Sequence, residues 1–78
     1  MVLAHLHRID PDANMARFYC IDLAPTLFGE ITVLRHWGRI GTCGRTSIET
    51  WPSEDEAEDA ARRTLRQKSR RGYRPAER

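Results

Sequence analysis

The amino-acid sequence predicts an α+β fold, in which an antiparallel meander of four to five β-strands packs against one C-terminal α-helix. Four runs rich in β-branched and aromatic residues follow one another with short connections. Short connections favour antiparallel pairing, because parallel strands need long crossovers. After Pro52 the apolar residues recur with a helical period instead. The 78 residues are enough for one small core, so we expect a single domain over residues 1–78.

The connections between the expected strands carry the features that end each strand. The strands are expected at residues 2–9, 16–24, 30–40 and 44–51. Gly41 and Gly44 bound the last connection and can adopt the positive φ angles that a tight hairpin needs. Leu27 and Phe28 lie in the connection before the third strand. As large apolar residues, they are expected to pack under the sheet.

The helix is expected to cover residues 54–71. Ser53 and Glu56 form the capping-box pattern at its start, and acidic residues in the first turn with basic residues in the last suit the helix dipole. Gly72 is predicted to end the helix, with Tyr73 packing back on its last turn. Five residues fall on one narrow stripe that suits close packing on a sheet: Ala57, Ala60, Ala61, Thr64 and Leu65.

The charge of the chain is unevenly distributed. The net charge is +2, but residues 62–78 hold eight basic residues and one acidic residue, whereas residues 1–61 hold five basic and ten acidic residues. This asymmetry indicates an anionic partner. Lys68 and Arg71 fall on the sheet side of the last helical turn, so the Lys68 amine must either reach solvent or meet an anion at the sheet edge. Four arginines lie opposite the alanine stripe and are interpreted as a solvated face: Arg62, Arg63, Arg66 and Arg70.

Several classes of protein are not expected from this sequence. Met1 leads into an alternating segment rather than a signal peptide, and no apolar run is long enough to span a bilayer. We therefore expect a soluble, cytoplasmic protein without a membrane partner. His5 and His7 share a strand face, but no further ligands follow at a recognisable spacing, so no metal site is expected. Cys20 is expected in the core and Cys43 in an exposed turn.

Catalysis is not expected either. The sequence shows no recognisable nucleophile–base arrangement and no phosphate-binding loop. One small sheet with one helix also offers little concave volume for a substrate. We therefore expect a protein that is not an enzyme and has no cofactor.

The segment from Arg35 to Arg39 is the best candidate for a binding surface. Alternation places Arg35, Trp37 and Arg39 on one face of the third strand. Guanidinium groups bind phosphate, and an indole offers a flat face for a base or a sugar. Gly38 removes a side chain, so that a partner can approach the backbone, and the turn amides after Gly41 can add contacts to an anion.

The same segment also has a purely structural interpretation. Ile31 and Val33 lie on the face that carries Arg35, so Trp37 would then complete an apolar stripe. In that case Gly38 would mark a β-bulge. The residue pattern is compatible with both a binding surface and a structural hairpin.

The segment "HWGRIGTCG" resembles the signature of the WGR domain, which is named for Trp37, Gly38 and Arg39 as they stand here. The likeness extends over nearly the whole chain. The segment "RFYCIDL" (17–23) resembles the aromatic second strand of the family, and "KSRRGY" (68–73) resembles the closing segment of bacterial members. WGR domains are best known from poly(ADP-ribose) polymerases, where they bind DNA near strand breaks. The resemblance implies a sheet crossed by one helix. It also implies that Trp37 stacks on the sugar or base at a DNA end, and that Arg39 contacts the phosphate or a partner.

These features together predict a non-catalytic nucleic-acid-binding module, similar to freestanding bacterial WGR proteins, that binds DNA at ends, nicks or single-stranded regions. The alternative is a protein–protein interaction adaptor that uses the same surface, because tryptophan and arginine dominate interface hot spots. Little base readout is expected, because no groove-reading helix is apparent. The expected interface residues are Arg35, Trp37, Gly38, Arg39, Gly41, Lys68 and Arg71.

Overall fold

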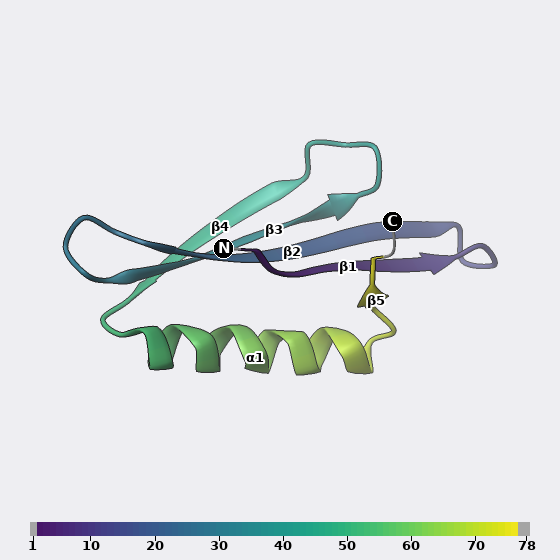
Figure 1. Cartoon of the computed structure of the whole chain (residues 1–78). Coiled ribbons are helices and arrows are strands. Elements are labelled where there is room, and N and C mark those ends of the chain that lie inside the picture. Colours follow the sequence, from purple (N-terminus) through teal and green to yellow (C-terminus); the bar gives the residue numbers. More distant parts are fainter. Residues whose placement is uncertain (1, 77–78) are drawn as a thin grey trace.

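The computed structural model describes residues 2–76, in which five strands form one antiparallel sheet and one helix lies across one of its faces (Figure 1). The elements are β1 (Val2–Asp10), β2 (Met15–Pro25), β3 (Ile31–Arg39), β4 (Arg45–Trp51), α1 (Glu54–Arg70) and β5 (Arg74–Pro75). Hydrogen-bonded neighbours follow the order β4-β3-β2-β1-β5, and every pair is antiparallel. The short β5 returns from the helix to pair with β1. The predicted α+β fold is therefore confirmed.

The start of α1 follows the predicted capping pattern. Ser53 has extended backbone angles, and its Oγ accepts the Glu56 backbone N–H at 3.3 Å. The same hydroxyl donates to the Glu56 carboxylate at 3.1 Å. The cap thus satisfies one of the amides that a helix N-terminus leaves without an intrahelical partner.

The end of α1 forms a Schellman motif around Gly72. This residue has a φ of +98°, and its N–H donates to the Ser69 carbonyl at 3.1 Å, while the Tyr73 N–H donates to the Lys68 carbonyl at 3.0 Å. Helix α1 ends at Arg70, one residue earlier than the sequence predicts. The motif reverses the chain direction, so that Tyr73 packs back and is buried, as predicted.

The core lies between the sheet and α1. The alanine stripe is buried as predicted, and its small side chains let the helix pack closely on the strands. Two of these residues, Ala57 and Ala61, are completely inaccessible to solvent. The sheet and the segment after α1 contribute Leu6, Tyr19, Ile21, Leu23, Val33 and Tyr73 to the core cluster.

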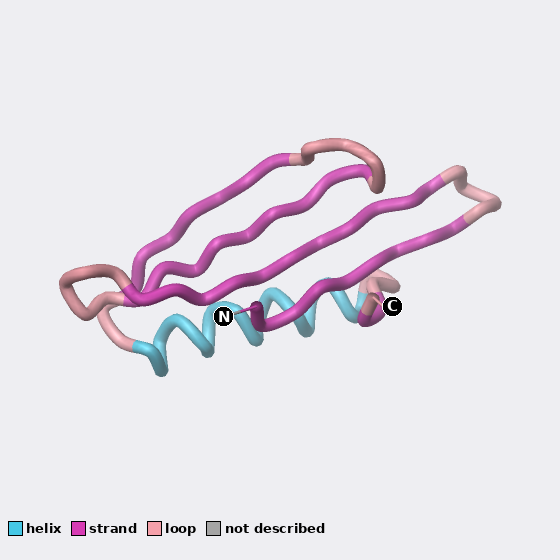
Figure 2. Tube along the Cα trace, turned by 45° about the horizontal axis from the view of Figure 1, so that its top comes forward, coloured by secondary structure: helices cyan, strands magenta, loops and turns pink. Residues whose placement is uncertain are grey.

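The prediction that Leu27 and Phe28 pack under the sheet is wrong. Leu27 is 99% exposed and Phe28 is 88% exposed. The loop is closed by a hydrogen bond from the Thr26 N–H to the Glu30 carbonyl at 2.8 Å, so the β2–β3 hairpin continues to its tip. Figures 1 and 2 show this tip beyond the start of α1, where the helix provides no apolar surface to pack against.

The sheet face opposite α1 is not covered by any described element (Figure 1). Cys20 lies on this face, with His5 and His36 as its neighbours on β1 and β3. It is half-buried rather than in the core, which corrects the prediction, because alternation places it opposite the buried Ile21. Cys43 is exposed, as predicted. In residues 2–76 no group of three or more His, Cys, Asp or Glu residues is arranged to hold a metal ion. None of the described segments forms a helix long and apolar enough to cross a membrane.

Strand β3 has no bulge at Gly38, contrary to the structural interpretation of the sequence. Gly38 pairs with Phe18 on β2, and the register continues without a break along the strand. A Cβ atom on Gly38 would lie only 2.6 Å from the Gly44 Cα, so glycine is required because the β3–β4 connection packs against it. The register shift in the sheet lies in β1 instead, between Val2 and Ala4.

Candidate nucleic-acid interface

Trp37 lies on the sheet face that α1 covers, beyond the most buried part of the core. Its indole stacks on the Tyr19 ring with the centroids 6.0 Å apart and an interplanar angle of 22°. Tyr73 contacts Tyr19 edge-on, with centroids 6.3 Å apart. Trp37 is half-buried and packs against the core cluster, so its orientation is fixed while part of the ring faces solvent.

Four arginines lie on the same face as Trp37, at one end of the sheet. The register pairs Arg8 with Arg17 and Arg17 with Arg39, so the three form a row across β1, β2 and β3. Arg45 on β4 pairs directly with Trp37. Because neighbouring strands lie about 4.8 Å apart, the row spans roughly 10 Å. We call Arg8, Arg17 and Arg39 the arginine row.

The arginine row has no acidic partner within residues 2–76. No ion pair joins Arg8, Arg17 or Arg39 to a carboxylate of the described chain. The Asp10 carboxylate, near the same end, accepts the Ala13 N–H at 3.3 Å instead. Like charges directly opposite each other on neighbouring strands destabilise a sheet. The charge of the arginine row is therefore not balanced by ion pairs within residues 2–76.

Lys68 brings a further cation to this site from α1. Its Nζ lies 4.6 Å from the centroid of the Tyr19 ring and 5.3 Å from that of Tyr73, so the ammonium makes cation–π contacts on the sheet side of the helix. Burial lowers the pKa of Lys68, and the charges of Arg71 and Arg17 lower it further. The last turn of α1 thus lies next to the arginine row. The sequence left open how the Lys68 amine is accommodated, and the two tyrosine rings provide the answer.

The lowered pKa of Lys68 predicts how stability changes with pH. The folded protein binds this proton less tightly than the unfolded chain, whose lysine titrates near the ordinary value of 10.5. The charged Lys68 ammonium therefore lowers the free energy of unfolding at neutral pH. This destabilisation decreases as the pH rises through the pKa of Lys68 in the folded protein, because the side chain then loses its charge. We expect the free energy of unfolding of the wild type to rise relative to that of Lys68→Met between about pH 7 and pH 10.

Urea denaturation of both proteins across this range measures the difference. Burial raises the pKa of Tyr19 above its ordinary value of 10.0. Both proteins contain this tyrosine, so the comparison between them isolates the contribution of Lys68. Lys68 is the one lysine in the sequence, so NMR titration of its side chain reads its pKa directly. A stability difference that stays flat or falls with pH contradicts the prediction.

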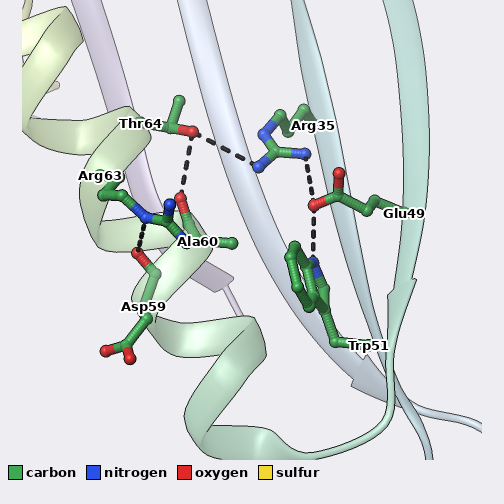
Figure 3. A network of polar contacts seen from close by, with 7 residues as sticks. All are labelled: Arg35, Glu49, Trp51, Asp59, Ala60, Arg63 and Thr64. Atoms are coloured by element: carbon green, nitrogen blue, oxygen red, sulfur yellow. Dashed lines mark hydrogen bonds and ion pairs between the residues drawn. The ribbon is translucent and has the colours of Figure 1, made fainter.

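Arg35 has a different environment from the other arginines. One guanidinium nitrogen lies 3.4 Å from the Glu49 carboxylate and another donates to the Thr64 hydroxyl at 3.4 Å (Figure 3). Only 16% of the Arg35 side chain is exposed. Glu49 also accepts the Trp51 indole N–H at 2.6 Å. Arg35 therefore joins the sheet to α1, with its charge balanced by Glu49, and lies toward the middle of the sheet rather than in the arginine row.

Removing the Glu49 carboxylate is expected to destabilise the fold. Glu49→Ala removes one of the two acceptors of the largely buried Arg35 guanidinium, and it removes the acceptor of the Trp51 indole N–H. We expect a loss of about 1–3 kcal/mol in the free energy of unfolding, the range for leaving buried donors unsatisfied. Urea denaturation measures the loss, with the exposed Glu30→Ala as the control. Equal stability of the two variants would show that the contacts in Figure 3 contribute little.

The glycines of the β3–β4 connection act through the backbone. Gly38 lies on the sheet face opposite Trp37, and the space beside it is filled by Gly44 rather than left free for a partner. Gly41 has a φ of +93° in the turn. The amide that follows it, that of Thr42, donates to the Arg39 carbonyl at 3.1 Å, so it is engaged in the turn. These contacts fix the backbone on both sides of Arg39.

The structure brings together most, but not all, of the residues that the sequence predicts for the interface. Trp37, Arg39, Lys68 and Arg71 lie at the end of the molecule where α1 finishes, whereas Arg35 does not (Figure 1). Sequence reasoning missed Arg8, Arg17, Arg45, Tyr19 and Tyr73. For Arg8 and Arg17 a signal was present, because a short turn at residues 11–14 places them opposite each other on one face.

Comparison with known proteins agrees with the family resemblance noted in the sequence. The family model of the WGR domain matches residues 2–78. The chain belongs to the WGR domain family. WGR domains in poly(ADP-ribose) polymerases are nucleic-acid-binding domains. The Trp37-Gly38-Arg39 segment that gives the family its name lies in β3, and its Arg39 belongs to the arginine row.

An uncharacterized protein from Sinorhizobium fredii, y4dW, is 46% identical to this WGR chain over 71 residues. The match covers 91% of this chain and 35% of y4dW, so the chain spans about a third of the length of that relative. No solved structure shows significant similarity to this WGR chain.

Proposed function

We propose that this WGR chain is a non-catalytic nucleic-acid-binding module that binds DNA at ends or nicks, with the phosphate backbone on the arginine row and a terminal sugar or base on Trp37. The observation that carries the proposal is the row of Arg8, Arg17 and Arg39, which faces the same side as the half-exposed indole and has no carboxylate partner in the described residues. Arginine guanidinium groups bind phosphate oxygens in a bidentate geometry. Arg45, Lys68 and Arg71 add positive charge around the same ring.

The position of Trp37 favours an interrupted duplex over a continuous one. Its ring lies nearly parallel to that of Tyr19, at an interplanar angle of 22°, and packs against the core cluster. A flat aromatic surface can stack only on a base or sugar face that no neighbouring base pair covers. Ends, nicks and single-stranded regions expose such faces, whereas an intact duplex exposes only the edges of its bases in the grooves.

Base specificity and catalysis are not part of this proposal. Helix α1 packs its small residues on the sheet, so it does not project as a recognition helix into a groove. The histidines lie on the sheet face away from Trp37 and the arginine row. Arginines and a tryptophan bind phosphate and aromatic faces, but they do not supply general acid–base chemistry at neutral pH.

Fluorescence anisotropy with a labelled DNA duplex that carries a 5′-phosphorylated nick tests the proposal. Intact circular duplex is the competitor. The key variant is Trp37→Leu, and the matched control is Trp51→Leu, the other tryptophan of the chain, at the far end of the same face. We expect the nick to bind more tightly than circular DNA. We also expect Trp37→Leu to weaken binding by about 5- to 150-fold, the range for losing one stacked base, while Trp51→Leu binds like the wild type.

Three results would overturn parts of the proposal. Equal affinity for nicked and circular DNA would exclude recognition of ends. Unchanged affinity of Trp37→Leu, with native circular dichroism, would place the interface elsewhere. Binding of no nucleic acid at about 0.15 M salt would favour the alternative, an adaptor in which Trp37 and Arg39 anchor a protein partner.

A further inference from the structure

The tip of the β2–β3 hairpin exposes two large apolar side chains. Leu27 is 99% exposed and Phe28 is 88% exposed, and hydrogen bonds close the loop that carries them. The Thr26 hydroxyl accepts the backbone N–H groups of Phe28 and Glu30 at 3.2 and 3.3 Å. Gly29 supplies the positive φ of +85° that completes the turn. The two side chains are thus held in solvent by a defined loop.

An apolar hollow lies at the base of the same hairpin. It is lined by Leu23, Ala24, Pro25, Ile31 and Glu54. The hollow and the tip belong to one hairpin, because Pro25 and Ile31 flank the loop that carries Leu27 and Phe28. The strand register places Pro25 and Ile31 at one end of the β2–β3 pair and Arg17 and Arg39 at the other, so this end lies away from the arginine row. Exposed apolar side chains gathered at one end of a small folded protein favour a site of interaction there.

The charges around this surface are acidic. Residues 18–34 and 46–61 contain no lysine or arginine. Glu54 lines the hollow, and Asp55 follows it in the first turn of α1. Glu30 closes the hairpin loop. This end of the molecule therefore repels nucleic acid and anionic lipid. It also disfavours a two-fold contact with a second copy, which would place acidic residues of both copies together.

We propose that this apolar end, defined as Leu27, Phe28 and the hollow beside them, docks a polypeptide segment whose apolar side chains are flanked by lysine or arginine. The apolar residues of the segment would cover Leu27 and Phe28 and enter the hollow, while its basic residues face Glu30, Glu54 and Asp55. The inference does not rest on nucleic-acid binding, because the apolar end and the arginine row lie at opposite ends of the molecule.

Selection from a display library of random 16-residue peptides tests the proposal. The wild type is the bait, and the double variant Leu27→Ser/Phe28→Ser is used for counter-selection. Both side chains are exposed, so the variant keeps the fold, which circular dichroism checks. We expect the enriched peptides to combine large apolar residues with lysine or arginine. A selected peptide, measured by calorimetry, is expected to bind the double variant at least 10-fold more weakly.

Two further variants define the surface. Glu54→Gln/Asp55→Asn is expected to weaken the same peptide about 3-fold and to reduce the salt dependence of its binding. Ile48→Thr is the control, because Ile48 is 66% exposed but lies on the opposite sheet face. No DNA is present in these measurements, so failure here is distinct from failure of nucleic-acid binding.

The proposal is overturned by any of three results. The first is that binding of the enriched peptides does not depend on Leu27 and Phe28. The second is that the enriched peptides lack basic residues. The third is a wild-type dimer in sedimentation equilibrium that Leu27→Ser/Phe28→Ser dissociates. The last result would assign the apolar end to a second copy of this chain.

Discussion

Replacing Gly44 with alanine is expected to destabilise the protein by about 4 kcal/mol, the largest effect that the structure predicts for a single methyl group. Gly44 has a φ of +70°, which non-glycine residues adopt with strain. A Cβ atom there would overlap the Trp37 carbonyl and lie 2.8 Å from the Phe18 ring. The backbone carbonyl cannot move without breaking the pairing of β3, so the overlap cannot be relieved by a change of rotamer.

Urea denaturation monitored by circular dichroism measures this effect, with Gly29→Ala as the matched control. Gly29 also has a positive φ, of +85°, but a Cβ atom there would meet nothing within 4 Å. We expect Gly29→Ala to lose about 1 kcal/mol through backbone strain alone. A small domain has only about 5 kcal/mol or little more of stability, so Gly44→Ala would retain about 1 kcal/mol and a measurable fraction would be unfolded without denaturant. Similar losses for the two variants would show that Gly44 is not tightly packed against the Trp37 carbonyl and the Phe18 ring.

Removing two members of the arginine row is expected to weaken nucleic-acid binding by about two orders of magnitude. Arg17→Ala/Arg39→Ala deletes two guanidinium groups that are direct neighbours on β2 and β3. Hydrogen bonds to charged groups contribute about 1.5–3 kcal/mol each, which sets this scale. Each lost phosphate contact also lowers the slope of log affinity against log salt concentration by about 0.9, so the slope should fall by nearly 2.

Anisotropy titrations at several salt concentrations measure both quantities. The control is Arg62→Ala/Arg66→Ala, which removes the same charge from exposed positions on α1. If both double variants lose affinity equally, binding reflects net charge and not the arginine row. The Arg17→Ala/Arg39→Ala variant is expected to be at least as stable as the wild type, because it removes like charges that face each other across the strands. Weaker nucleic-acid binding without a loss of stability would show that Arg17 and Arg39 serve binding and not folding.

Local patterns in the sequence predicted the elements well. The helix followed from Ser53, Glu56 and Gly72, which act on amides and carbonyls within a few residues of themselves. The alternation in β3 correctly placed Trp37 and Arg39 on one face. Alternation in β2 likewise places Cys20 on the face away from the helix. The prediction of a core cysteine was wrong because it used the residue type and ignored which face of the strand the side chain occupies.

The two interpretations of the Arg35–Arg39 segment both hold in part. Trp37 completes the apolar face by packing on Tyr19, and part of its ring also remains exposed beside unpaired arginines. Arg35 belongs to the structural interpretation, since Glu49 and Thr64 hold it. The sequence could not separate Arg35 from Arg39, because both have the same spacing from Trp37. The two arginines differ in their tertiary neighbours: Arg35 contacts Glu49 on β4 and Thr64 on α1, whereas Arg39 pairs with Arg17 on β2.

The sequence by itself determined the order of the elements, the caps of α1, the face that carries Trp37 and the membership of the WGR family, because these depend on neighbouring residues or on a recognisable motif. Only the tertiary structure decided which side chains meet between distant segments. The register of three strands brings Arg8, Arg17 and Arg39 into a row, and the last turn of α1 places Lys68 beside them. The length of the β2–β3 hairpin relative to α1 leaves Leu27 and Phe28 in solvent. Each of these depends on how segments far apart in sequence align, which no local pattern specifies.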